Sequence, residues 1–221
     1  REAAALHPGL VPRTRVIHNP YISDRMIARS VERNPAGPPL ILSIGRLSEQ
    51  KNHALLLNAT ARLRDRPWRL RICGTGPQEE ALRALADNLG IGERLDLPGF
   101  CADPIPDYLA ATVTALSSRW EGLPGTVLEA IACGCPVLST ASSPGLVELL
   151  RSVRAREPVA REDELGLSLA LDAALDGGLP AVSPADAIPY GIEAACDEHA
   201  NLFAGLLGDR LVLGHHSSSS S

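Results

Sequence analysis

The chain has 221 residues, of which 45% are hydrophobic, 21% are charged and only 3% are aromatic, and its formal net charge is -5. This composition is typical of a globular protein with room for one sizeable domain, and it excludes wholesale disorder. The negative charge argues against a general binder of nucleic acid or of membrane surfaces. No apolar run approaches the ~20 residues that a membrane-spanning helix needs.

Short aliphatic runs alternate with helical patterns along the first two thirds of the chain. Residues 15–17 and 40–44 are predicted strands, and the second of them ends at Gly45. A helix is predicted over residues 52–63, where leucine and alanine recur at helical spacing. Residues 70–73 form the next predicted strand, so the pattern alternates from its start.

The same alternation continues towards the middle of the chain. The next predicted elements are a helix and three strands, at residues 78–89, 94–97, 113–116 and 136–139. Another helix is predicted to begin near Pro124 or Gly125, before the last of these strands. Strands separated by helices of about 10–15 residues indicate βαβ units. The sequence therefore predicts an α/β fold, a Rossmann-like doubly wound parallel sheet covered on both faces.

Towards the C-terminus the pattern is weaker, and only two helices are predicted, over residues 163–175 and 192–207. The simplest architecture is one domain over residues 12–210. Its core is expected within residues 12–150, and its C-terminal helices within residues 163–208.

The two ends of the chain are expected to lie outside this domain. The first residue is Arg1 rather than methionine, and no signal-peptide segment follows it, so we expect the sequence to be a fragment of a longer protein or a processed chain. Residues 214–221 are low in complexity and are expected to be a tail without a place in the fold.

Five cysteines are present, an odd number without the paired spacing of a zinc site. They are Cys73, Cys101, Cys133, Cys135 and Cys196. We expect reduced, buried structural thiols in a reducing cytoplasm, and a redox or metal role is the alternative.

The most informative motif covers residues 121–129, where Glu121 and Glu129 flank a Gly-Leu-Pro-Gly turn. Pro124 suits the first turn of a helix, and a helix N-terminus with free N–H groups attracts phosphate. Because carboxylates repel phosphate, we expect the two glutamates to accept hydrogen bonds from hydroxyl groups instead. Together these features predict a nucleotide-sugar site; the alternative is a solvated acidic loop.

Two further motifs follow predicted strands, at the edge where parallel sheets bind ligands. Residues 45–51 place Arg46 and Lys51 on either side of a helix start, where they could grip phosphate or be ordinary solvated charges. Glycines in residues 74–77 let the backbone approach a ligand, or make a tight turn. This is no dinucleotide fingerprint, because Glu79 stands at the position of the third glycine.

Two shorter segments also follow strands. In residues 98–100, Gly99 could admit a flat base beside Phe100, or the segment could be a turn with a core phenylalanine. Residues 142–145 either supply further backbone donors or turn the chain into the next helix.

Taken in order, these motifs resemble the C-terminal, donor-binding half of a retaining glycosyltransferase of the GT-B fold, family 4 (group 1). The matching residues are Gly45-Arg46-Leu47 with Lys51, the glycine turns at 74–77 and 98–100, the pair Glu121 and Glu129, and Gly134 with Pro136-Val137. The resemblance spans roughly residues 16–150.

The resemblance implies a role for each matching residue. Arg46, Lys51 and Glu121 would be the catalytic set, in which the two cations neutralise the donor diphosphate without a metal or other cofactor. Glu121 would face the donor sugar, and Glu129 would bind the ribose hydroxyls. The remaining donor-binding residues would be Gly45, Gly74, Gly76, Phe100, Gly122, Leu123, Pro124, Gly125 and Thr126.

The resemblance also implies partners and a location. The donor would be a UDP-, GDP- or ADP-sugar used in glycan biosynthesis, with a hexose as the transferred group. The acceptor would bind an N-terminal domain that is absent from this chain, so we expect donor binding without efficient transfer. The location would be the cytoplasm, with the full-length protein able to associate with the inner face of a membrane. The alternatives are a nucleotide-sugar epimerase of GT-B architecture and a non-catalytic nucleotide-sugar-binding module.

Overall fold

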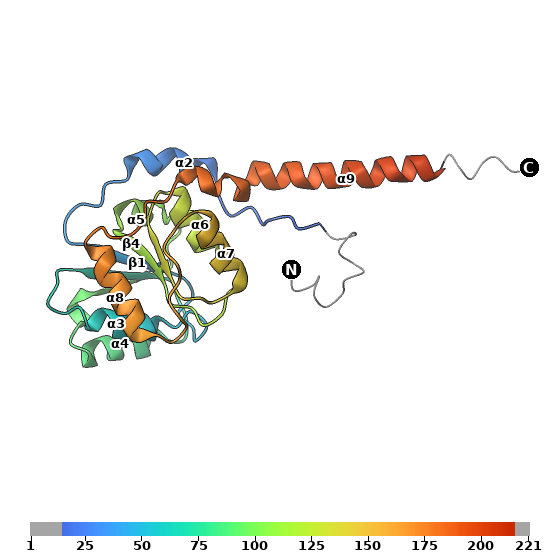
Figure 1. The fold of residues 1–221 in the computed structure, drawn as a ribbon. Helices are drawn as coiled ribbons and strands as arrows, with labels where there is room; N and C mark the ends of the chain where they lie inside the picture. The colour runs from blue at the N-terminus through green and yellow to red at the C-terminus, as the bar shows by residue number, and fades with distance from the viewer. Residues whose placement is uncertain (1–14, 215–221) are drawn as a thin grey trace, which may run out of the picture. The chain divides into compact units, whose positions relative to one another are not determined.

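The computed structural model describes residues 15–214 (Figure 1). These residues form two compact units, one comprising Ile22–Ile188 and the other residues 15–21 together with 189–214. All the predicted site residues lie in the first of these, which is called the larger unit below. The residue limits predicted for the domain and for its core stay predictions.

The larger unit is built on five parallel strands in the order β3-β2-β1-β4-β5. Their bounds are β1 Leu40–Ile44, β2 Arg69–Cys73, β3 Leu95–Gly99, β4 Val113–Leu116 and β5 Val137–Ser139. Every residue of β4 and β5 is buried, as expected of strands covered on both faces of a parallel sheet. The predicted doubly wound α/β class is therefore confirmed.

Helices cover both faces of this sheet. Their bounds are α2 Asp24–Arg29, α3 His53–Ala61, α4 Glu79–Asn88, α5 Ile105–Ala110, α6 Gly125–Ala132, α7 Pro144–Ser152 and α8 Glu164–Leu175. In Figure 1, α3, α4 and α8 gather on one face, while α2, α5 and α6 lie on the other. Helices α2 and α5 were not predicted from the sequence, because six residues are too few to show a helical period.

Helix α8 is part of the main hydrophobic core rather than an appendage. Its side chains Leu167 and Leu171 are fully buried, in the same cluster as Leu56 of α3 and Ile41 of β1. Asp163 caps the start of α8, because its carboxylate accepts a hydrogen bond from the Gly166 N–H at 2.7 Å. Leu165 and Leu169 of the same helix are 53% and 62% exposed, so only one face of α8 packs into the core.

One predicted strand in the smaller unit is wrong. Residues 15–17 are not a strand: they have no ladder partner, and Val16 is 67% exposed, so the segment lacks the pairing that stabilises an extended chain. Tyr21 N–H donates to the carbonyl of Tyr190 at 3.0 Å. Helix α9, Ile192–Gly214, begins where predicted and continues further.

Of the predicted tail, Gly214 ends α9, and residues 215–221 lie outside the described residues. Within residues 15–214, no helix is long and apolar enough to cross a bilayer.

Candidate functional site

The carboxyl ends of β1 and β4 lie where the strand order reverses. From β1 the chain continues to β2 on one side, and β4 pairs with β1 on the other. Doubly wound sheets bind ligands in the crevice outside such a switch point. The loop after β1, residues 45–52, and the loop after β4, residues 117–124, meet here. The first carries Arg46 and Lys51, and the second carries Glu121.

Hydrogen bonds fasten these two loops together. The backbone N–H of Arg119 donates to the carbonyl of Gln50 at 2.8 Å, and Ser117 Oγ donates to the carbonyl of Lys51 at 3.0 Å. Gln50 Nε2 donates to the carbonyl of Trp120 at 3.0 Å, across 70 residues of sequence. The relative position of the charged side chains is therefore fixed by tertiary contacts.

Lys51 and Glu121 form a largely buried ion pair in this crevice. Lys51 Nζ lies 2.6 Å from Glu121 Oε1, and the two side chains are only 19% and 8% exposed. Ser118 Oγ donates to the same carboxylate oxygen at 2.7 Å. Gly45 leaves room for the lysine, since a Cβ there would lie 3.0 Å from Lys51 Cε. An anionic ligand would compete with Glu121 for the ammonium group.

Arg46 stands beside this pair with a different environment. Its side chain is exposed, and the part of the chain that the structure describes gives its guanidinium no ion-pair partner. Its loop is nonetheless fixed, because the adjacent Leu47 N–H donates to the carbonyl of Thr75 at 2.9 Å. An available guanidinium on a fixed backbone suits the binding of phosphate oxygens.

Gly74 and Gly76 are required for the packing of two loops. A Cβ at Gly74, which has a φ of +154°, would collide with the carbonyl oxygen of Gly45, and one at Gly76 would collide with the carbonyl of Leu47. The loop after β2 therefore lies directly against the loop after β1. Contact of these glycines with a nucleoside stays a prediction, since their packing role alone accounts for both.

The start of α6 faces the crevice with unpaired donors. Pro124 precedes the helix with an extended ψ of 117°, and no side chain caps the first turn, which begins at Gly125. The first N–H groups of a helix have no intrahelical acceptors and carry a partial positive charge. Ser143 Oγ holds the preceding turn by donating to the carbonyl of Gly122 at 2.7 Å. Thr126 Oγ1, in the first turn, is buried without a hydrogen-bond partner.

Glu129 lies one turn further along α6 and contacts a residue that the sequence analysis did not name. The hydroxyl of Tyr108, on α5, donates to Glu129 Oε2 at 2.8 Å. Burial raises the pKa of Glu129, although the bond from Tyr108 opposes this, and burial also raises the pKa of Tyr108 well above its usual value. The one sequence signal for this contact is the aromatic residue itself, among the six residues of α5.

Two further buried polar groups at the site were missed. His53 Nδ1 and Ser142 Oγ have no hydrogen-bond partner. Burial, with the nearby charge of Lys51, lowers the pKa of His53 to about 4. The carbonyl of Ser142 accepts from the backbone N–H of Glu121 at 3.2 Å, which places it beside the ion pair. Buried polar atoms without partners are rare and often mark a bound ligand or water.

Phe100 lies apart from the ion pair on the same sheet edge. Its side chain is 78% exposed, so the alternative of a core phenylalanine is wrong. Gly99 before it has a φ of +86°, which turns the chain at the end of β3. Since β2 separates β3 from β1, the ends of β3 and β1 lie about 10 Å apart, which a nucleotide can span.

Comparison with known proteins agrees with this geometry. The family described as "Glycosyl transferases group 1" matches residues 24–181, a range that contains every predicted site residue. The chain belongs to the group 1 glycosyltransferases. As such it corresponds to their donor domain, and the resemblance drawn from the ordered motifs is confirmed.

Named relatives of this group 1 domain are longer than the chain. An N-acetylgalactosaminyltransferase of Campylobacter jejuni, which acts on a diphospho-undecaprenol-linked sugar, is 31% identical over 157 residues, covering 71% of this chain and 40% of the relative.

Solved structures show the same fold over most of the chain. Sucrose-phosphate synthase of Thermosynechococcus elongatus matches with a TM-score of 0.67 at 22% identity, covering 87% of this chain and 50% of the other. Anabaena HepE in complex with UDP and glucose matches with a TM-score of 0.66 at 17% identity, covering 86% and 56%. The chain thus spans about half or less of each of these three proteins.

Proposed function

We propose that the crevice between residues 45–52 and 117–124 binds the diphosphate and sugar of a nucleotide-sugar. The observation that carries the proposal is the buried ion pair of Lys51 and Glu121 beside the uncapped start of α6. Cation, carboxylate and backbone donors meet there at the switch point of the sheet. That combination suits a ligand that is anionic at one end and rich in hydroxyls at the other.

Sugar transfer breaks the bond between the anomeric carbon and the diphosphate, and negative charge then grows on the leaving group. Arg46, Lys51 and the first N–H groups of α6 would stabilise this charge. As Lys51 turns to the phosphate, Glu121 loses its cation and can accept a hydrogen bond from a sugar hydroxyl. Ser118 would keep the carboxylate in place during this exchange, through its bond of 2.7 Å.

The nucleoside would extend from the crevice along the sheet edge. Glu129 would accept the ribose hydroxyls on the oxygen that Tyr108 leaves available, and Phe100 would offer its exposed ring to the base. A UDP-sugar is the first donor to test, because the Anabaena structure holds UDP. GDP- and ADP-sugars are the comparators.

The full enzyme would transfer a hexose with retention of configuration to an acceptor held by another domain. Because the chain covers only 40% of the Campylobacter relative, we expect this chain alone to bind donor without transferring it. Full-length protein that binds donor tightly but neither transfers nor hydrolyses the sugar would indicate a non-catalytic binding module instead.

Titration calorimetry with the three donor classes tests the site. Arg46→Ala and Glu129→Ala should each abolish or strongly weaken donor binding. Their matched controls are Arg69→Ala, an exposed arginine at the amino end of β2, and Glu80→Ala, an exposed glutamate on α4. Wild-type affinity in both site variants would overturn the assignment. In a parallel melting assay, donor at 100-fold its dissociation constant should stabilise by about 2.7 kcal/mol, or about 5–10 °C.

A further inference from the structure

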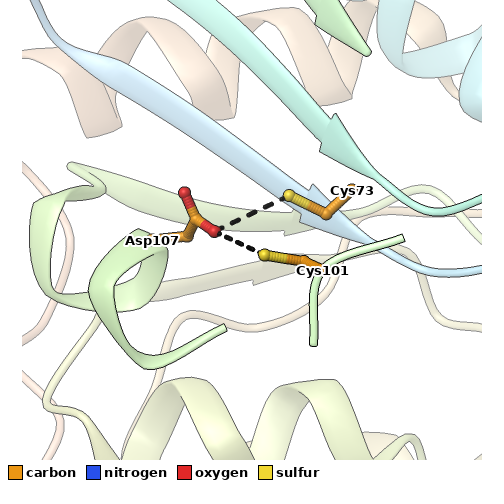
Figure 2. A group of neighbouring side chains, drawn as sticks. All are labelled: Cys73, Cys101 and Asp107. Atoms are coloured by element: carbon orange, nitrogen blue, oxygen red, sulfur yellow. Dashed lines mark hydrogen bonds between the residues drawn. The ribbon is translucent and has the colours of Figure 1, made fainter. Parts of the chain in front are cut away.

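Three potential metal ligands converge at the carboxyl ends of β2 and β3. Figure 2 shows Cys73, Cys101 and Asp107 pointing towards one another from β2, from the loop after β3 and from α5. Their ligand atoms all lie within 4.8 Å of one another. Asp107 Oδ2 accepts from Cys101 Sγ at 3.1 Å and from Cys73 Sγ at 3.9 Å. One carboxylate oxygen thus stands between two thiols.

We propose that Cys73, Cys101 and Asp107 bind a thiophilic divalent cation, with Zn²⁺ as the best match. Zn²⁺ favours tetrahedral sites with thiolate and carboxylate among the ligands, and three protein ligands would leave the fourth position to water. With its usual bond lengths, ligand sulfur and oxygen atoms lie about 3.5 Å apart, and two sulfur atoms about 3.8 Å apart. The sulfur–oxygen distances of 3.1 and 3.9 Å already lie on either side of this value.

The surrounding charges come close to balancing such an ion. Two thiolates and one carboxylate would carry three negative charges, and Zn²⁺ supplies two positive ones. Arg71 supplies the third, because its Nη1 lies 2.6 Å from Asp107 Oδ1, the oxygen that faces away from the thiols. Arg71 also pairs with Asp96, whose Oδ2 lies 2.7 Å from Arg71 Nε, so the ion, its ligands and these two residues would together keep one negative charge. Arg71 would orient the ligating carboxylate from outside the first coordination sphere.

The two thiols differ in access, which gives an entry route for the ion. Cys73 is only 1% exposed, whereas Cys101 is partly exposed at the edge of the sheet. Coordination would then displace one proton from each cysteine.

Titration of reduced, metal-free protein with Co²⁺ tests the proposal, because cobalt bound by thiolate absorbs in the near ultraviolet. We expect one ion per chain, competition by Zn²⁺, and release of two protons per ion in calorimetry. Cys101→Ser should eliminate this absorption, and Asp107→Asn should weaken binding. Arg71→Ala should weaken it by about 10–100-fold. Cys196→Ser, an exposed cysteine of α9, is the matched control and should bind normally.

Two outcomes would overturn the proposal. One is unchanged cobalt absorption in Cys101→Ser, whose fold is verified by circular dichroism; this variant is chosen because the residue is less buried than Cys73. The other is a reduced protein that takes up no ion. If the protein instead loses two hydrogens on mild oxidation and takes up no ion, the pair forms a disulfide. None of these measurements requires a nucleotide, so their outcome does not depend on whether the proposed donor site is correct.

Discussion

The carboxyl edge of the sheet has two halves with different chemistry. At the ends of β1 and β4, the buried pair of Lys51 and Glu121 is charged, and hydrogen bonds between two loops fix it. At the ends of β2 and β3, Phe100 is exposed, and Cys73 and Cys101 share a carboxylate. We propose phosphate and sugar as ligands of the first half, and a base and a thiophilic cation as ligands of the second. One sheet edge can thus hold chemically distinct sites, because each strand delivers its own loop.

The charged half should be the more sensitive to mutation. Glu121→Ala should destabilise the fold by about 3–5 kcal/mol, because it leaves Lys51 largely buried without its counter-ion. Urea unfolding measures this loss. The double variant Lys51→Met with Glu121→Leu should recover most of the stability while donor binding stays lost. Equal stability of Glu121→Ala and wild type would contradict a buried pair.

Acidification should lower the free energy of unfolding through His53, which lies next to the charged half of the sheet edge. Its pKa is lowered from 6.5 to about 4 in the fold, so the folded state favours the neutral ring. The neutral His53 ring contributes its full share of the stability above pH 6.5. This contribution, about 3 kcal/mol in all, is lost as the pH falls towards 4.

The measurement for His53 is the slope of unfolding free energy against pH between 6.5 and 4. His53→Gln should flatten that slope, whatever its effect on absolute stability. His199, on α9, supplies the control as His199→Gln. A wild-type slope in His53→Gln would show that other groups govern the acid response.

The contact between the loop after β1 and the loop after β2 should be sensitive to a single added methyl group. Gly74→Ala places a Cβ against the carbonyl oxygen of Gly45, and we expect a loss of about 1–3 kcal/mol by thermal unfolding. Gly122→Ala is the control, because nothing lies within 4 Å of a Cβ at that glycine. A variant as stable as wild type would mean that the two loops separate readily.

The aromatic residue of the second half should matter least for stability. Phe100→Ala should change the unfolding free energy by no more than about 0.5 kcal/mol, because the ring is 78% exposed. Donor affinity should nonetheless fall, since a stacking surface for the base is removed. Val31→Ala, at an apolar residue that is 88% exposed, should alter neither quantity. If Phe100→Ala bound the donor with wild-type affinity, this result would contradict the binding of the base at this half of the sheet edge.

Much of this fold could be read from the sequence because its strands and helices are local patterns. The strands β1 and β4 have the predicted limits, and α6 begins at the predicted Gly125 after Pro124. The short helices α2 and α5 escaped prediction, and the supposed strand at residues 15–17 failed, since a run of three residues specifies neither a period nor a partner.

The sequence by itself determined the family, the fold class and the residue types at the strand ends, because ordered motifs and periodicity are properties of the chain alone. Only the tertiary structure decided which of those residues meet. It joined Lys51 to Glu121 across 70 residues, and Asp107 to Cys73 across 34. Strand order sets these encounters, and it depends on how the whole chain buries its apolar faces rather than on any local spacing.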